Sequence, residues 1–165
     1  FTFFNTLIAA SELNIAFSPL SNLIKPLFLQ NIITQYQFDC LIIDKNVFEN
    51  IDIETKKLIQ RKILNIILIK NDKISIFKTS ISNKKKNNYF LMCFTSGSTG
   101  APKSILLSQN SKILRAKCVI DLYNLDQNDK ILITTPLYHT LAFRKLIINI
   151  ILNSECYIKT GFDPN

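Results

Sequence analysis

The sequence has very little of several residue types on which particular kinds of protein depend. Only three glycines, one methionine and one histidine occur among 165 residues, and tryptophan is absent. The four cysteines form no C-x-x-C pair, so a zinc module or a disulfide scaffold is not indicated. The apolar runs are short and interrupted by lysine, asparagine or arginine, whereas a membrane-spanning helix needs about 20 apolar residues. These absences argue against metal-binding modules and integral membrane proteins.

The cysteines are scattered through the chain, and each lies among apolar neighbours. Cysteine in such surroundings behaves as a small buried hydrophobe, and a reduced thiol is the default in the cytoplasm. We therefore expect a cytoplasmic protein with four buried, reduced thiols: Cys40, Cys93, Cys118 and Cys156.

The composition that remains is typical of a globular domain with a basic bias. Hydrophobic residues make up 47% and charged residues 19%, and the formal net charge is +8. The excess is mostly lysine in a chain also rich in isoleucine and asparagine, a bias typical of an AT-rich genome. We therefore expect no nucleic-acid partner. The sequence begins at Phe1 without a basic region before an apolar core, so we expect no signal peptide and a start inside a longer protein.

Apolar periodicity predicts helices that alternate with strands, which favours an α/β fold with a mostly parallel sheet covered by helices. A polar, lysine-rich stretch at 79–88 is the best candidate for a linker. Either Ser108 or Asn110 is expected to cap the N-terminus of the helix predicted at 110–123. The predicted helices are 2–13, 22–36, 53–62, 110–123 and 141–152. The predicted strands are 14–20, 40–43 (a buried one), 65–70, 74–78, 89–95, 103–108, 130–135 and 155–159.

Residues 94–104, "FTSGSTGAPKS", combine two of the three glycines with five hydroxyl side chains, four of them beside the glycines, and a lysine. Glycine allows positive φ and a close approach of the backbone, and successive N–H groups in such a turn converge on an anion. The hydroxyls add donors and the lysine adds a mobile positive charge. The stretch therefore predicts a loop that binds the oxygens of a triphosphate or pyrophosphate, through Thr95, Ser96, Gly97, Ser98, Thr99, Gly100 and Lys103.

The loop does not have the spacing of a Walker A motif. In that motif four residues separate the glycines and the lysine follows the second glycine directly. Here two residues separate Gly97 from Gly100, and Lys103 comes three positions later. The segment after the lysine, "SILLS", has the composition of a strand, whereas a Walker loop opens a helix. We therefore expect the phosphate loop to lie between two strands.

The segment "FTSGSTGAPKSILLS" resembles the signature loop of the adenylate-forming superfamily, which includes acyl-CoA synthetases, luciferases and adenylation domains of peptide synthetases. The family pattern is T-S-G-[ST]-T-G-x-P-K-G-V after a hydrophobic residue. Ser104 stands where the family has glycine, and its side chain could crowd the loop. Gln109 stands where a histidine often follows the serine or threonine.

A second segment, "TTPLYHTLAF" at 134–143, resembles the P-L-[FY]-H-x-x-G motif of CoA synthetases, with Ala142 in place of the glycine. The resemblance continues into the final "FDP" and back to "LIAASELNIAFSPLSN". It therefore extends over nearly the whole chain, most strongly at 94–107 and 136–139.

His139 is the only histidine, and several roles are compatible with its residue type. A general base needs a partner that the sequence does not indicate, and a metal site needs further ligands. A plain, hydrogen-bonded histidine is the other alternative. The resemblance implies that His139 lines the acyl-binding site beside the adenylate, which favours CoA synthetases over peptide-synthetase domains. Tyr138 is expected to be a packing residue or a pocket wall.

The resemblance implies that residues 1–165 are part of the large N-terminal domain of an adenylate-forming enzyme, without its C-terminal domain. Such an enzyme uses ATP and Mg²⁺ to convert a small carboxylic acid to acyl-AMP and then transfers the acyl group to CoA. The adenine, ribose and Mg²⁺ sites would follow Asn165. We therefore expect the chain to be inactive by itself, and to be poorly soluble because its sheet edges are left unpaired.

Three alternatives remain at this point. The chain could belong to an adenylation domain that loads a carrier protein, or to a nucleotide-binding relic that kept the fold and lost the chemistry. A nucleic-acid-binding module is supported by charge alone. The sequence does not specify the carboxylic acid or the oligomeric state.

Overall fold

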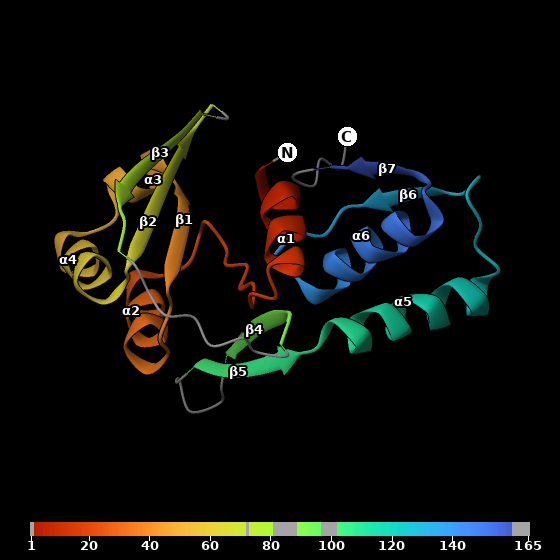
Figure 1. Cartoon of the computed structure of the whole chain (residues 1–165), viewed down its shortest axis with the longest axis horizontal. Helices are drawn as coiled ribbons and strands as arrows, with labels where there is room; N and C mark the ends of the chain where they lie inside the picture. Colours follow the sequence, from red (N-terminus) through yellow and green to blue (C-terminus); the bar gives the residue numbers. More distant parts are fainter. Residues whose placement is uncertain (1, 72, 81–88, 97–101, 160–165) are drawn as a thin grey trace. The chain divides into compact units, whose positions relative to one another are not determined.

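The structure, a computed structural model, describes residues 2–71, 73–80, 89–96 and 102–159 (Figure 1). The helices in these residues are α1 (Thr2–Glu12), α2 (Pro26–Gln35), α3 (Lys45–Asn50), α4 (Ile53–Lys62), α5 (Gln109–Tyr123) and α6 (Thr140–Leu152). The strands are β1 (Cys40–Asp44), β2 (Asn65–Lys70), β3 (Lys73–Lys78), β4 (Leu91–Ser96), β5 (Pro102–Leu107), β6 (Lys130–Ile133) and β7 (Glu155–Ile158).

The chain divides into two compact units, and the division runs across the paired strands β4 and β5. The first unit comprises Phe1–Ala9, Ser21–Lys86 and Phe94–Ser104. The second unit comprises Ala10–Leu20, Asn87–Cys93 and Ile105–Asn165. None of the described helices is both long enough and apolar enough to cross a membrane.

The first unit contains a three-stranded sheet in the order β1-β2-β3 (Figure 1). Strands β1 and β2 are parallel, with Cys40 opposite Asn65, and β3 runs antiparallel to β2. A parallel pair needs a crossover connection, and α3 and α4 provide it between β1 and β2. β3 needs only a short turn, in which Asn71 adopts a positive φ of 49°. The prediction of a mostly parallel sheet therefore holds for β1–β2 but not for β3.

The core of the first unit forms where apolar faces of α2, α4 and β2 are withdrawn from solvent. Ile32, Ile59 and Ile66 are all fully buried. Thr55 is also fully buried, and its hydroxyl donates to Asp52 Oδ2 at 2.6 Å and accepts from Gln30 Nε2 at 2.7 Å. A buried hydroxyl costs free energy unless it is hydrogen-bonded, so this chain of contacts connects α2 to the N-terminus of α4.

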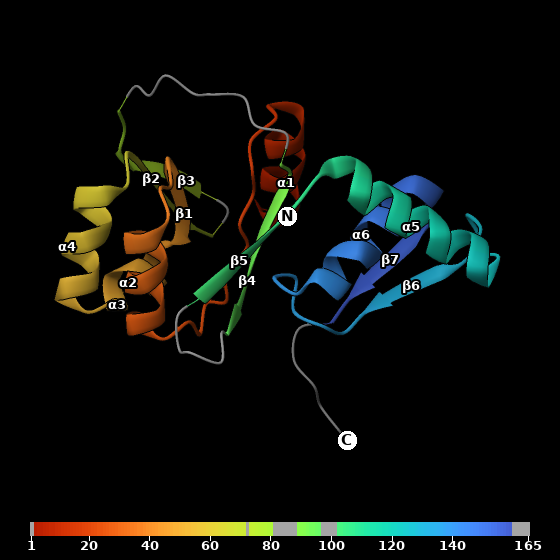
Figure 2. The same ribbon diagram turned by 90° about the horizontal axis from the view of Figure 1, so that it is seen from below.

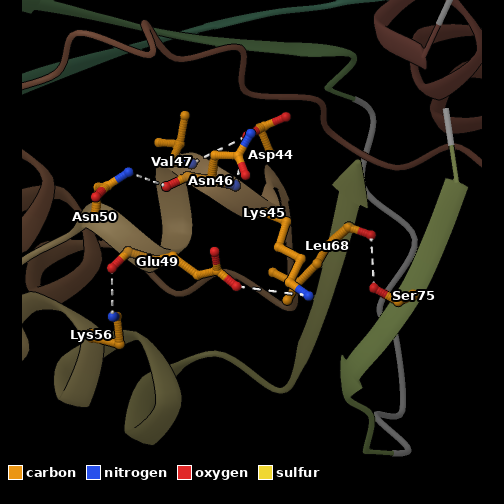
Figure 3. A network of polar contacts seen from close by, with 9 residues as sticks. All are labelled: Asp44, Lys45, Asn46, Val47, Glu49, Asn50, Lys56, Leu68 and Ser75. Carbon is orange, nitrogen blue, oxygen red and sulfur yellow. Dashed lines mark hydrogen bonds and ion pairs between the residues drawn. The ribbon is translucent and has the colours of Figure 1, made fainter. Parts of the chain in front are cut away.

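Helix α3 was not predicted, because its six residues are too few for a visible apolar period. Asp44 caps it by accepting from the backbone N–H of Asn46 at 2.8 Å and of Val47 at 3.2 Å (Figure 3). Lys45 pairs with Glu49 one turn later, at 3.7 Å between Nζ and Oε1. The capping aspartate immediately after a strand was the available sequence signal.

The second unit contains a parallel pair, β6–β7, in which Lys130 is opposite Glu155. Helix α6 connects these strands and contacts both of them and α5 (Figure 2). Its buried side chains are Ala142, Phe143, Leu146, Ile147 and Ile148. Ser108 caps α5 by accepting from the N–H of Ser111 at 3.2 Å, as one of the two predicted caps.

Most predicted elements are confirmed, and three differ. The strand predicted at 14–20 is reduced to one bridge between Phe17 and Leu91, and the helix predicted at 22–36 begins only at Pro26. Proline fixes φ and lacks an N–H, so it is favoured in the first turn of a helix. The third difference concerns the strand predicted at 40–43, which was expected to be buried. Cys40 and Ile42 in β1 are exposed instead. Strand β1 is an outer strand, and only alternate side chains on it are partly covered. The predicted linker at 79–88 falls mostly outside the described residues.

The prediction that all four thiols are buried is also wrong. Only Cys93 is buried, Cys156 is half-buried, and Cys40 and Cys118 are exposed. Cys118 lies in α5, where apolar neighbours in the sequence point in different directions around the helix. Local apolar surroundings in the sequence therefore do not establish burial.

One buried lysine distinguishes the second unit. Lys112 in α5 is 4% exposed, and its ammonium lies 5.5 Å from the centre of the Phe143 ring. Burial lowers the pKa of Lys112 below 10.5, and the nearby Arg115 and Arg144 lower it further while Cys93 opposes the shift. Burial raises the pKa of the Cys93 thiol, partly offset by Lys112. The described residues provide no ion pair for this ammonium.

Candidate functional site

The strands β4 and β5 bracket the segment that the sequence predicts to bind phosphate. Strand β4 ends at Ser96, and strand β5 begins at Pro102. The placement of the loop between two strands is therefore confirmed. Four of the predicted phosphate-binding residues, Gly97, Ser98, Thr99 and Gly100, lie outside the described residues.

Thr95 and Lys103 come together across the hairpin at the base of this segment. The Thr95 hydroxyl donates to the backbone carbonyl of Lys103 at 3.5 Å, and both residues are exposed. The Lys103 ammonium has no ion-pair partner among the described residues. The Lys103 ammonium is thus available to an anion at this exposed end of the hairpin, whereas the Thr95 hydroxyl would have to release the Lys103 carbonyl before it could donate to one.

Tyr36, which the sequence did not single out, is hydrogen-bonded to the start of β5. Its hydroxyl donates to the Pro102 carbonyl at 3.3 Å and accepts from the Ser104 N–H at 3.2 Å. These two residues flank Lys103 in the strand. Tyr36 is distant from them in sequence and sits just after α2, so no local motif could have indicated the contact.

The other strand of the hairpin, β4, is contacted by two aromatic rings, those of Tyr36 and Phe38. The half-buried ring of Phe94 in β4 meets the Tyr36 ring edge-on, with 5.2 Å between the centroids and 61° between the planes. The centroid of the Phe38 ring lies 6.5 Å from that of the Phe94 ring. Edge-to-face pairs at such distances are favourable, so the α2–β1 connection contacts both strands at the base of the loop.

Ser104, which replaces the family glycine, is an interior residue of β5 and is half-buried. Its N–H is already bonded to Tyr36. We expect Ser104→Gly to lower the free energy of unfolding by about 0.5–1 kcal/mol, because glycine loses more backbone entropy on entering a strand. Urea unfolding of the two proteins measures this difference, and a variant that is more stable than the parent would contradict it.

His139 is the residue before α6 and is exposed. Its N–H donates to the Pro136 carbonyl at 2.9 Å, so "PLYH" forms a turn that leads into the helix. The imidazole caps no backbone N–H of α6, and its centroid lies 4.6 Å from that of the Tyr138 ring. Among the described residues no acidic side chain is bonded to it. His139 belongs to the second unit, whereas Thr95 and Lys103 belong to the first.

The two remaining departures from the family pattern lie in regular helices. Ala142 is fully buried in the first turn of α6, where alanine is a better helix former than glycine. Gln109 begins α5, and its Nε2 donates to the Ser11 hydroxyl at 3.0 Å. Within the described ranges no group of three or more His, Cys, Asp or Glu side chains could hold a metal ion.

The family model for AMP-binding enzymes matches residues 2–164. Indoleacetate–CoA ligase of Aromatoleum aromaticum is 51% identical over 49 residues, which are 30% of this chain and 10% of that protein. An acyl-CoA synthetase of Alternaria alternata is 34% identical over 68 residues, which are 41% of this chain and 12% of that protein. The chain therefore matches only about a tenth of the length of these relatives.

Among solved structures, ATP-bound MatB from Rhodopseudomonas palustris has the same fold over this region. The TM-score is 0.72 at 16% sequence identity, and the match covers 96% of this chain and 33% of that chain. The fold described above is thus shared with about one third of that protein.

Proposed function

Since the chain belongs to the AMP-binding enzyme family, we propose that it supplies the phosphate-binding part of an acid–thiol ligase. The relatives named above are CoA ligases or acyl-CoA synthetases, which supports this class over other adenylate-forming enzymes. In the proposed reaction a carboxylate oxygen attacks the α-phosphorus of ATP, pyrophosphate leaves, and the acyl group passes from AMP to the thiol of CoA.

The single observation that carries the proposal is the hairpin base, where Thr95 is bonded to the Lys103 backbone and the Lys103 ammonium faces solvent. The carboxylate and ATP are both anionic, so catalysis depends on positioning and on neutralising charge. We propose that the Lys103 ammonium and the hydroxyls of Thr95, Ser96, Ser98 and Thr99 hold the β- and γ-phosphates. The N–H groups of Gly97 and Gly100 would complete the loop.

Mg²⁺ would offset part of the triphosphate charge when bound. Its ligands would come from the phosphates, from water and from other parts of the enzyme. We further propose that His139 and Tyr138 form one wall of the acyl site, with His139 as a contact residue and not a base. This role is the one that the resemblance of residues 134–143 to the CoA synthetase motif implies.

Replacing Lys103 with alanine tests the proposed phosphate site. We expect the dissociation constant of MgATP for the chain to rise about tenfold, because a charge-assisted contact to phosphate is removed. Titration calorimetry at fixed ionic strength measures it, since screening alters such contacts. Lys117→Ala is the matched control, because it removes an equally exposed lysine from α5.

Two outcomes would contradict the proposal. Equal weakening by both lysine variants would indicate attraction by net charge alone, and no weakening by Lys103→Ala would remove that residue from the site. We also expect no ATP–pyrophosphate exchange from this chain by itself, because two thirds of the matched enzyme is outside it. Exchange by the chain by itself would disprove that expectation.

A further inference from the structure

We propose that Tyr36 is a positioning residue for Lys103, because its hydroxyl holds the backbone on both sides of that lysine. This inference rests on the proposed function, because it concerns the same anion site. It adds a residue from the first unit that is remote in sequence from the loop and that no motif in the chain contains.

The hydroxyl of Tyr36 makes two bonds to one short stretch of strand. It donates to the Pro102 carbonyl at 3.3 Å and accepts from the Ser104 N–H at 3.2 Å. A phenol hydroxyl has one proton to donate and lone pairs to accept, so both bonds can exist together. Lys103 lies between these two residues, and its backbone can move only if one of the bonds breaks.

The alternation of β5 places Lys103 on the exposed face of the strand. Successive side chains in a strand point to opposite faces. Pro102 is buried and Ser104 half-buried, whereas Lys103 is exposed. Pro102 and Ser104 therefore share the more covered face of β5, and Lys103 lies on the exposed face, while the Tyr36 hydroxyl bonds the backbone at the edge between the two faces.

Tyr36 is itself held at its backbone and at its ring. Its N–H donates to the Ile32 carbonyl at 2.9 Å, which ends α2, and Ile32 is fully buried. Its ring packs edge-on against Phe94 in β4. The hydroxyl is thus presented from a fixed position, and the ring contact reaches the strand that carries Thr95.

Such an anchor affects binding through preorganisation. A lysine whose backbone is already ordered loses less conformational freedom when it closes on a phosphate than one on a frayed strand. Tyr36 does not need to touch the ligand for this effect. Its removal should weaken anion binding and at the same time loosen the Ser104 amide.

The experiment is Tyr36→Phe in the chain labelled with ¹⁵N, with inorganic tripolyphosphate and Mg²⁺ as the probe at constant ionic strength. Phenylalanine keeps the ring against Phe94 and removes only the hydroxyl. We expect the dissociation constant read from the Lys103 and Ser104 amide shifts to rise about fivefold. Hydrogen exchange of the Ser104 amide should accelerate by about the same factor.

Tyr157→Phe is the matched control. Its hydroxyl donates to Glu155 at 2.9 Å in the second unit, so the change also removes one bonded tyrosine hydroxyl. We expect it to leave tripolyphosphate binding and Ser104 exchange within twofold of the parent.

The readouts separate the two claims. If the parent chain shows no tripolyphosphate-dependent shifts at Thr95, Lys103 or Ser104, the proposed function is rejected, and the positioning role with it. If the parent binds and Tyr36→Phe binds equally well, only the role of Tyr36 is overturned. Faster Ser104 exchange with unchanged binding would likewise reduce Tyr36 to a structural contact.

Discussion

Replacing Phe143 with alanine is expected to lower the free energy of unfolding by about 4 kcal/mol. Phe143 is fully buried in α6. Its ring centroid lies 5.7 Å from that of Phe90 in an edge-on contact and 6.4 Å from that of Phe17. Truncation removes the transfer free energy of the ring and leaves a cavity that the neighbouring helix and strands can close only partly.

Urea unfolding followed by circular dichroism measures this loss. Tyr123→Ala is the control, because Tyr123 is an aromatic residue of α5 that is 68% exposed. We expect the control to change stability by less than about 0.5 kcal/mol, as exposed substitutions usually do. Losses of similar size from both variants would mean that the ring of Phe143 is not the centre of the core of the second unit.

Replacing Lys112 with methionine is expected to raise the free energy of unfolding by about 2 kcal/mol at pH 7. Lys112 is 4% exposed, and its ammonium forms no ion pair with a described residue. Its position over the Phe143 ring, 5.5 Å from the centroid, provides a cation–π contact that offsets only part of the lost hydration. Methionine has a similar length and helix propensity and requires no hydration.

The gain in the free energy of unfolding from Lys112→Met should decrease as the pH rises. Burial holds the folded-state pKa of Lys112 below its ordinary value of 10.5, so the unfolded chain binds the proton more tightly. The penalty of the buried charge is therefore fully present below the folded pKa and disappears as pH rises to the ordinary value. Cys93 acts in the opposite direction, because burial raises its pKa and favours the folded state while the thiol is protonated.

The comparison of parent and variant at each pH isolates Lys112, since Cys93 is present in both. Melting temperatures from pH 6 to pH 10 provide the measurement. Lys117→Met is the control, because it makes the same exchange at an exposed position of α5. A Lys112→Met protein that is less stable than its parent at pH 7 would show that the ammonium has an anionic partner in the folded chain.

Elements with a strong local signal could be predicted from the sequence. The helix α4 was predicted with the bounds it has, and Ser108 was one of the two predicted caps of α5. These features depend on residues within a few positions of one another. Helix α3 was not predicted, because a short charged helix has little apolar periodicity. The start of α2 was predicted four residues too early, because the apolar pattern before Pro26 outweighed the helix-start signal of that proline.

The candidate site divides in the same way. The sequence by itself determined that "TSGSTGAPK" lies between two strands and that "PLYH" leads into a helix, since turn residues and apolar runs adjoin one another there. Only the tertiary structure decided that Tyr36 is bonded to the start of β5, that Lys112 is buried, and that Cys40 and Cys118 are exposed. The physical reason is that burial and bonds between distant segments depend on which faces of helices and strands meet, and the order of residues along the chain does not specify those pairings.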